Sequence, residues 1–155
     1  AEIALRVREN PGFHAPRDDR PLILIGNGSG LAGLRGLLKQ RVNEQRRRNW
    51  LLFGERHAAQ DFFHKSDIEI WQAQGWIEHL DLAFSRDQSE RIYVQHLLQQ
   101  QPERLQAWID AGAVIMVCGS LAGMAQDVDA TLRDLLGDAT VTRLAAEGRY
   151  RRDVY

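Results

Sequence analysis

The amino-acid sequence predicts an α/β fold: a doubly wound, five-stranded parallel sheet with helices on both of its faces. Two observations predict it. Short, almost wholly apolar runs recur along the chain, which is typical of strands covered on both faces of a parallel sheet. Segments of helical length separate these runs, and this alternation favours right-handed crossovers between parallel strands. The composition agrees, since 44% hydrophobic and 26% charged residues are close to globular averages.

Four apolar runs and one terminal extended segment supply the five expected strands. The runs span residues 22–25, 50–53, 80–84 and 114–117, and the last strand ends in Val154-Tyr155. Segments of helical length lie between the runs, and in the first of them Leu34, Leu37, Leu38 and Val42 share one helical face. The expected helices span residues 31–46, 58–74, 93–101, 103–111, 121–136 and 141–147.

The first twenty residues have a different pattern from the rest. Ile3, Leu5 and Val7 alternate with more polar residues, as in a half-buried strand, and Asn10-Pro11-Gly12 then breaks the pattern. No hairpin partner follows this strand in the sequence. We therefore expect residues 1–20 to be the last strand of an upstream domain and a linker, and residues 21–155 to form one domain of a longer protein.

Charge, hydropathy and cysteine content exclude several classes of function. The 20 basic and 21 acidic side chains give a net charge of −1, which provides no general field for binding nucleic acid. No apolar run approaches the roughly 20 residues of a membrane helix, and the start lacks the pattern of a signal peptide. Cys118 is the single cysteine, and the five histidines show no metal-ligand spacing. We expect a cytoplasmic protein without a metal site.

A glycine-rich loop follows the first strand directly and leads into a helix. Its sequence is Gly26-Asn27-Gly28-Ser29-Gly30-Leu31-Ala32-Gly33. At the carboxyl edge of a parallel sheet, the backbone N–H groups of such a loop and the helix N-terminus can bind a pyrophosphate. A tight turn without a ligand is one alternative. Another is an NAD enzyme, because residues 28–33 match the dinucleotide fingerprint and Glu55 ends the second strand, where it could bind an adenosine ribose.

Polar and aromatic side chains gather after the third strand. Ser85, Arg86, Arg91 and Tyr93 follow one another there, and guanidinium groups match the geometry of phosphate oxygens. They could bind a ribose 2′-phosphate, with the adenine stacked on Tyr93. The alternative is a solvated loop that leads into a capped helix. After the fourth strand, the residue pattern alone favours Cys118 as a small buried side chain over a reactive thiol.

Several motifs then agree in order and spacing with a known family. They are the glycine loop, Phe53-Gly54-Glu55-Arg56, Ser85-Arg86-Asp87 with Arg91-Ile92-Tyr93-Val94-Gln95, Cys118-Gly119-Ser120 with Met124, Ala125 and Asp127, and the terminal residues 148–155. With these motifs, residues 21–155 resemble the NADP-binding domain of the ferredoxin–NADP reductase superfamily, and most closely the C-terminal domain of diflavin reductases of the sulfite reductase type. The first twenty residues resemble the end of that family's FAD-binding barrel.

The resemblance implies a role for each matched residue. The residues implied to bind the 2′-phosphate and adenine are Ser85, Arg86, Arg91 and Tyr93, supported by Gln95. Those implied to border the pyrophosphate are Gly28, Ser29, Gly30 and Arg56, and Asp127 corresponds to a further NADP contact. Cys118 and Asp153 would flank the nicotinamide C4, and Tyr155 would stack on the flavin ring. The chain departs from the family at Ser29, Gly33, Arg91 and Ser120, where threonine, proline, lysine and an acidic residue are common.

The resemblance thus implies an enzyme module that positions NADPH for hydride transfer to FAD. The FAD would be held by an upstream domain of the same parent chain, and electrons would pass on to an FMN domain or another redox protein. The isolated chain is expected to be inactive, and the sequence does not indicate whether the parent has a membrane anchor. Two alternatives remain open: a fragment of an NAD-dependent dehydrogenase that uses Glu55, and a nucleotide-binding module without turnover.

Overall fold

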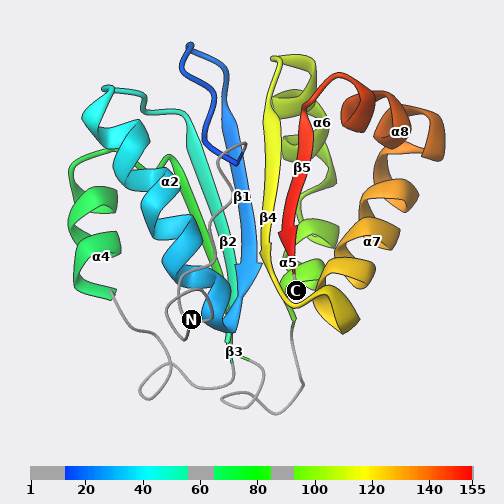
Figure 1. Cartoon of the computed structure of the whole chain (residues 1–155), viewed down its shortest axis with the longest axis horizontal. Coiled ribbons are helices and arrows are strands. Elements are labelled where there is room, and N and C mark those ends of the chain that lie inside the picture. The colour runs from blue at the N-terminus through cyan, green and yellow to red at the C-terminus, as the bar shows by residue number, and fades with distance from the viewer. Residues whose placement is uncertain (1–12, 56–64, 85–92, 155) are drawn as a thin grey trace, which may run out of the picture.

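The computed structural model describes residues 13–55, 65–84 and 93–154, which form a five-stranded sheet flanked by helices (Figure 1). The strands are β1 Leu22–Asn27, β2 Asn49–Glu55, β3 His79–Phe84, β4 Val114–Gly119 and β5 Tyr150–Val154. Their order in the sheet is β3-β2-β1-β4-β5, and every neighbouring pair is parallel. The predicted five-stranded parallel sheet is confirmed.

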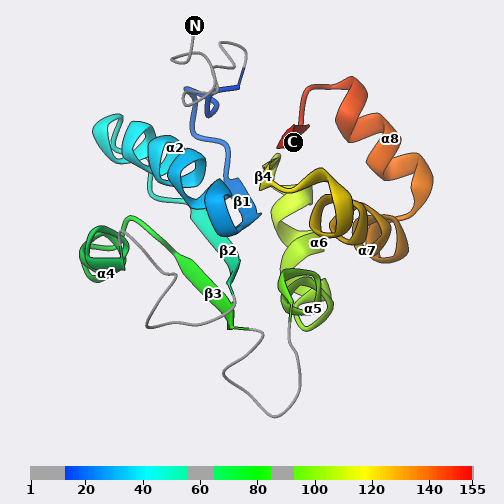
Figure 2. The same ribbon diagram turned by 60° about the horizontal axis from the view of Figure 1, so that its bottom comes forward.

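Helices cover both faces of the sheet (Figure 2). The helices are α2 Leu31–Asn43, α4 Lys65–Ala73, α5 Val94–Gln99, α6 Pro102–Asp110, α7 Gln126–Leu136 and α8 Asp138–Ala146. Helices α2 and α4 pack on one face of the sheet, and α5 to α8 pack on the other. Alternate residues of each inner strand enter the two cores, so Ile23 lies on the side of α5 to α8 and Leu24 on the side of α2.

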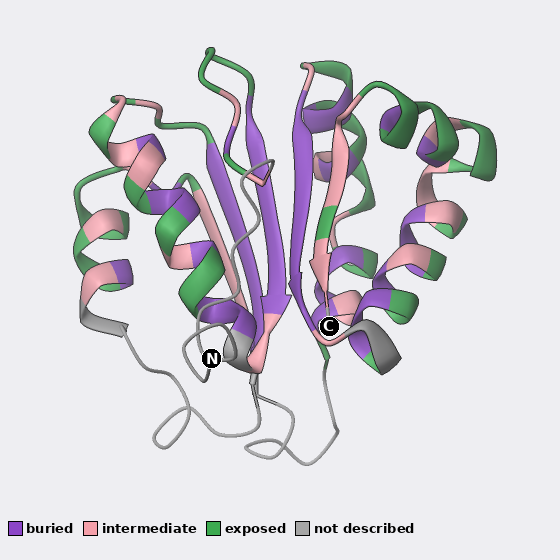
Figure 3. Cartoon of the chain, viewed as in Figure 1, coloured by how far each residue is buried: buried purple, intermediate pink, exposed green. Residues whose placement is uncertain are grey.

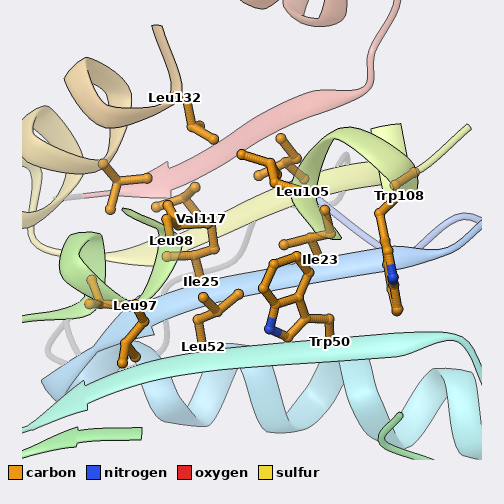
Figure 4. Packing of buried hydrophobic residues seen from close by; sticks show 14 of the residues in the cluster. Ile23, Ile25, Trp50, Leu52, Leu97, Leu98, Leu105, Trp108, Val117 and Leu132 are labelled. Carbon is orange, nitrogen blue, oxygen red and sulfur yellow. The ribbon is translucent and has the colours of Figure 1, made fainter. Parts of the chain in front are cut away.

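The larger core is built around tryptophan side chains (Figure 4). Trp50 of β2 and Trp108 of α6 are 0% and 3% exposed and pack edge to face, with 5.7 Å between ring centroids. The indole N–H of Trp50 donates a 2.7 Å hydrogen bond to Asp81 Oδ2, which satisfies its polar group. The inner strands β1, β2 and β4 are buried, whereas β5 at the edge is only half-buried (Figure 3).

The first helix is three residues shorter than expected because of a left-handed residue. Gln45 has φ 60°, and the N–H of Arg46 bonds the carbonyl of Arg41 at 2.8 Å. Such an arrangement ends a helix and is usually signalled by glycine or asparagine. Here glutamine takes this conformation, so no glycine or asparagine marks the position that ends the helix.

Residues 13–20, which we call the N-terminal strap, pack on α2 instead of extending away from it. Ala15 is 2% exposed, and its N–H and carbonyl both bond the side-chain amide of Gln40 at 3.1 Å. The guanidinium of Arg41 is buried beneath the strap and donates to the carbonyl of Arg20 at 2.7 Å. Arg151 of β5 donates to the carbonyl of His14 at 3.0 Å. The strap therefore joins α2 and the last strand.

The strand order contains one reversal of direction, between β1 and β4. The chain first winds outward from β1 to β2 and β3, and then crosses to the other side of β1 to form β4 and β5. In open α/β sheets, ligands bind beyond the carboxyl ends of the strands at such a switch point. None of the helices in the described part of the chain is long and apolar enough to cross a membrane.

Candidate functional site

The expected site residues are distributed along the carboxyl edge of the sheet, where the strand arrowheads end (Figure 1). Those in the described part of the chain are Gly28 and Gly30 after β1, Tyr93 and Gln95 at α5, Cys118 in β4, Asp127 in α7 and Asp153 in β5. Arg56, Ser85, Arg86, Arg91 and Tyr155 lie outside the described residues, and Ser29 is described only in its backbone.

The glycine loop forms a tight turn pressed against β4. Gly28 has φ 51°, a left-handed value that favours glycine. A Cβ atom on Gly30 would lie 2.3 Å from the carbonyl oxygen of Cys118, so only glycine allows this approach. Among the described side chains, none caps the start of α2 and none in its first turn is acidic. This geometry fits an anionic pyrophosphate at the helix N-terminus.

Two glycine-to-alanine variants of α2 and its cap should have opposite effects on stability. Gly30→Ala is expected to lower the free energy of unfolding by about 1–3 kcal/mol, because the methyl group collides with β4 backbone. Gly36→Ala should raise it by about 0.5–1 kcal/mol, since a Cβ there meets nothing within 4 Å and alanine favours the helix. Urea denaturation of both variants measures these effects. A neutral Gly30→Ala would contradict the close approach of the loop to β4.

Asn27 is a site residue to which the sequence pattern assigned no role. Its Oδ1 accepts a 3.4 Å hydrogen bond from the N–H of Ser120, and a Cβ on Gly119 would lie 2.4 Å from the same oxygen. The side chain thereby links the turn after β1 to the turn after β4. Its position between glycines is the available sequence signal, because a short amide at a strand end often bonds nearby backbone.

Cys118 and Asp153 are brought together by the pairing of β4 with β5. They are register partners in these parallel strands, so their side chains share the face that α2 covers. Cys118 is 3% exposed, and burial, with a smaller effect of the Asp153 charge, raises the pKa of its thiol to about 12. The thiol is therefore neutral at pH 7. This excludes a thiolate nucleophile and leaves a compact, uncharged side chain beside a carboxylate.

The raised pKa of Cys118 predicts a loss of stability at alkaline pH. The folded state favours the protonated thiol, so this contribution is complete below the ordinary pKa of 9 and is lost as pH rises from 9 towards 12. The thiol can contribute a slope of at most about 1.4 kcal/mol per pH unit. Urea unfolding between pH 8 and 11 should give a shallower decline for Cys118→Ala than for the wild type. Parallel declines would contradict the raised pKa.

The edge strand β5 is fixed to α7 through Tyr150 and Asp129. The phenol of Tyr150 donates to Asp129 Oδ1 at 2.8 Å, and Arg133 Nε donates to Oδ2 at 2.9 Å. Burial acts to raise the pKa of Asp129, but these two hydrogen bonds and the positive charges of Arg133 and Arg152 together outweigh it and lower the pKa below its ordinary value. This anchor holds the strand that carries Asp153, three residues further along.

Tyr93, Gln95 and Asp127 lie on the other side of the sheet, with α5 and α7. Tyr93 is 42% exposed, although neighbouring Val94 is buried in the core. Gln95 Nε2 is 3.5 Å from Asp127 Oδ2, so these two expected contacts are brought together. An exposed aromatic ring beside polar groups at a strand edge suits stacking with a flat base.

Comparisons with known proteins identify the family to which the chain belongs. A family model described as the oxidoreductase NAD-binding domain matches residues 24–130, which is most of the chain. The chain belongs to this family. In this oxidoreductase NAD-binding domain, the matched segment runs from β1 into α7 and includes both the glycine loop and Cys118. The resemblance found in the sequence is confirmed, and with it the class of a nicotinamide-dinucleotide-binding domain of an oxidoreductase.

Curated relatives of this NAD-binding domain are named sulfite reductase (NADPH) flavoprotein alpha-component. The relative from Neisseria meningitidis serogroup B is 40% identical over 99% of the chain. Those from Zymomonas mobilis and Vibrio cholerae are each 38% identical, over 96% and 100% of the chain. In all three the match covers 27% of the relative, so the chain spans about a quarter of the length of these proteins.

Proposed function

We propose that the chain is the NADP(H)-binding module of a flavin-dependent reductase. The observation that supports this best is the strand order. Along the carboxyl edge, β3, β1, β4 and β5 follow one another in that order. This is the order a dinucleotide would need if the residues after β3 bind the phosphate and adenine, the turn after β1 binds the pyrophosphate, and Cys118 with Asp153 contact the nicotinamide. Four inter-strand steps span about 19 Å, which suits an extended dinucleotide better than a mononucleotide.

Each part of this edge has its own task in the proposal. Arg86 and Arg91, with Ser85, bind the 2′-phosphate, and Tyr93 stacks on the adenine. The amides after β1 bind the pyrophosphate, with Arg56 beside them. The dinucleotide supplies a hydride from C4 of its nicotinamide. Cys118 and Asp153 orient that ring, and Asp153 also stabilises the positive charge that develops as the hydride leaves.

The groups that receive the electrons lie outside residues 21–155 in this proposal. Residues 1–20 belong to the end of an FAD-binding barrel and its connection, and Tyr155 covers the flavin until the nicotinamide displaces it. The names of the relatives, which include NADPH and flavoprotein, support this arrangement. The acceptor is an FMN domain or another redox protein, and the proposed location is the cytoplasm.

Cofactor preference tests the proposal. We expect the chain to bind NADP⁺ more tightly than NAD⁺, because the guanidinium groups after β3 recognise the 2′-phosphate. Losing one charge-assisted hydrogen bond costs about 1.5–3 kcal/mol, so Arg86→Ala should weaken NADP⁺ binding by about ten- to a hundredfold and leave NAD⁺ binding unchanged. Isothermal titration calorimetry with both dinucleotides measures this.

A matched variant controls for the loss of positive charge elsewhere. Arg143→Ala removes a 59%-exposed guanidinium from α8, and it should leave both affinities unchanged. Equal affinity of the wild type for NADP⁺ and NAD⁺ would contradict the proposal. In that case Glu55, at the end of β2, would be the residue to test as a ribose ligand of an NAD-dependent enzyme.

A further inference from the structure

The start of α5 is closed by a reciprocal pair of hydrogen bonds between Tyr93 and His96. The N–H of Tyr93 donates to His96 Nδ1 at 2.9 Å, and the N–H of His96 donates to the carbonyl of Tyr93 at 3.0 Å. The first bond is one half of a capping box, with an imidazole in the place where glutamate or glutamine usually accepts, and the second is a backbone hydrogen bond of the turn. The Tyr93 N–H bond requires a lone pair on Nδ1, so the imidazole proton is on Nε2.

The same pair determines where the Tyr93 ring stands. Tyr93 has an extended backbone, with φ −113° and ψ 168°, immediately before the first helical residue. On its C-terminal side, Val94 is 2% exposed and packs close to Gly54 of β2. The imidazole of His96 also lies beside the tyrosine ring, with 5.9 Å between the ring centroids. The backbone that carries this exposed residue is thus held both by the bonds to His96 and by the packing of Val94.

We propose that His96 is a positioning residue for dinucleotide binding, acting through Tyr93 without itself touching the ligand. The inference rests on the proposed function, in which Tyr93 stacks on the adenine. Stacking is effective only if the ring is held in place before the ligand arrives, since ordering it on binding would use part of the interaction energy. His96 does this by fixing the Tyr93 backbone and by flanking the ring.

The probe is adenosine 2′,5′-bisphosphate, which carries the adenine and the 2′-phosphate but no nicotinamide. We expect His96→Ala to weaken its binding by about three- to tenfold, the effect of one lost capping hydrogen bond. His96→Gln should remain within about twofold of the wild type, because a glutamine oxygen can accept from the Tyr93 N–H. Gln99→Ala, an exposed change at the end of the same helix, is the matched control and should have no effect. Calorimetry on the whole chain measures all of these.

Hydrogen–deuterium exchange gives a second readout that can be measured without any ligand. The Tyr93 amide should exchange faster in His96→Ala and return to the wild-type rate in His96→Gln. Failure of His96→Gln to restore affinity would overturn the proposal and indicate direct contact of the imidazole with the ligand. Unchanged affinity of His96→Ala, with weakened binding in Tyr93→Ala, would also overturn it and leave the proposed function intact. If neither Tyr93→Ala nor Arg86→Ala weakens binding, the proposed function fails as well.

Discussion

Replacing Arg41 with methionine is expected to lower the free energy of unfolding by about 3–5 kcal/mol. The Arg41 side chain is 0% exposed, and its two shortest hydrogen bonds go to Asn49 Oδ1 at 2.8 Å and the Arg20 carbonyl at 2.7 Å. Methionine fills similar space but leaves both acceptors unpaired, and a hydrogen bond from a charged group contributes about 1.5–3 kcal/mol. Chemical denaturation followed by tryptophan fluorescence measures the loss.

Arg41 keeps its charge although it is buried, and this is why the free energy of unfolding should fall so much when it is replaced. Burial, followed by the nearby Arg46 charge, lowers the pKa of Arg41 to about 10, so the guanidinium is still protonated at pH 7. Lys39→Met on the same helix is the control, because Lys39 is exposed, and it should change stability by less than about 0.5 kcal/mol. The amides of the N-terminal strap should exchange faster in Arg41→Met but not in Lys39→Met. Equal stability of the two variants would contradict a structural role for the buried guanidinium.

Arg41 also illustrates which features the sequence could not predict. Its helix presents Leu34, Leu37 and Leu38 to the core, and an arginine next in that pattern is normally exposed. Its acceptors are carbonyls of the N-terminal strap and the side chain of Asn49, which lie far apart in the sequence. Only the tertiary fold brings them together. The strap was expected to be a linker because Pro16 and two aspartates are typical of exposed connections. Its packing on α2 likewise depends on contacts between residues far apart in the sequence.

The strands and helices were predictable because their signals are local. Apolar runs identified the first four strands, the extended terminal segment identified the fifth, and helical spacing identified the helices between them. The order of the strands was not predictable, because a crossover of given length can return to either side of β1. That order places Cys118 beside Asp153, although 34 residues separate them in the sequence. The sequence associated these two residues only through a family resemblance, whereas the pairing of β4 with β5 gives the physical reason.

Under the proposed function, the largest catalytic effect is expected at the neutral thiol and the carboxylate of β4 and β5, measured in a protein that joins this module to an FAD domain. Asp153→Asn should slow flavin reduction by NADPH about a hundredfold or more, because the amide keeps the shape but loses the negative charge that stabilises a developing cation. NADPH itself carries no such charge on its nicotinamide before transfer, so its affinity should change little. The pairing of Asp153 with buried Cys118 strengthens this expectation, since charges act more strongly where water is excluded.

Stopped-flow reduction of the flavin with NADPH and with C4-deuterated NADPH measures the effect of Asp153→Asn. The isotope effect should rise in the variant, because hydride transfer becomes the slow step. Asp134→Asn, which removes an exposed carboxylate from α7, is the matched control and should leave rate and isotope effect unchanged. Cys118→Ala should slow transfer less than Asp153→Asn does, because a neutral thiol contributes shape and packing but no charge to the transition state. If Asp153→Asn weakened NADPH binding at an unchanged transfer rate, the carboxylate would be a binding group only, and stabilisation of charge in the transition state would have to come from elsewhere.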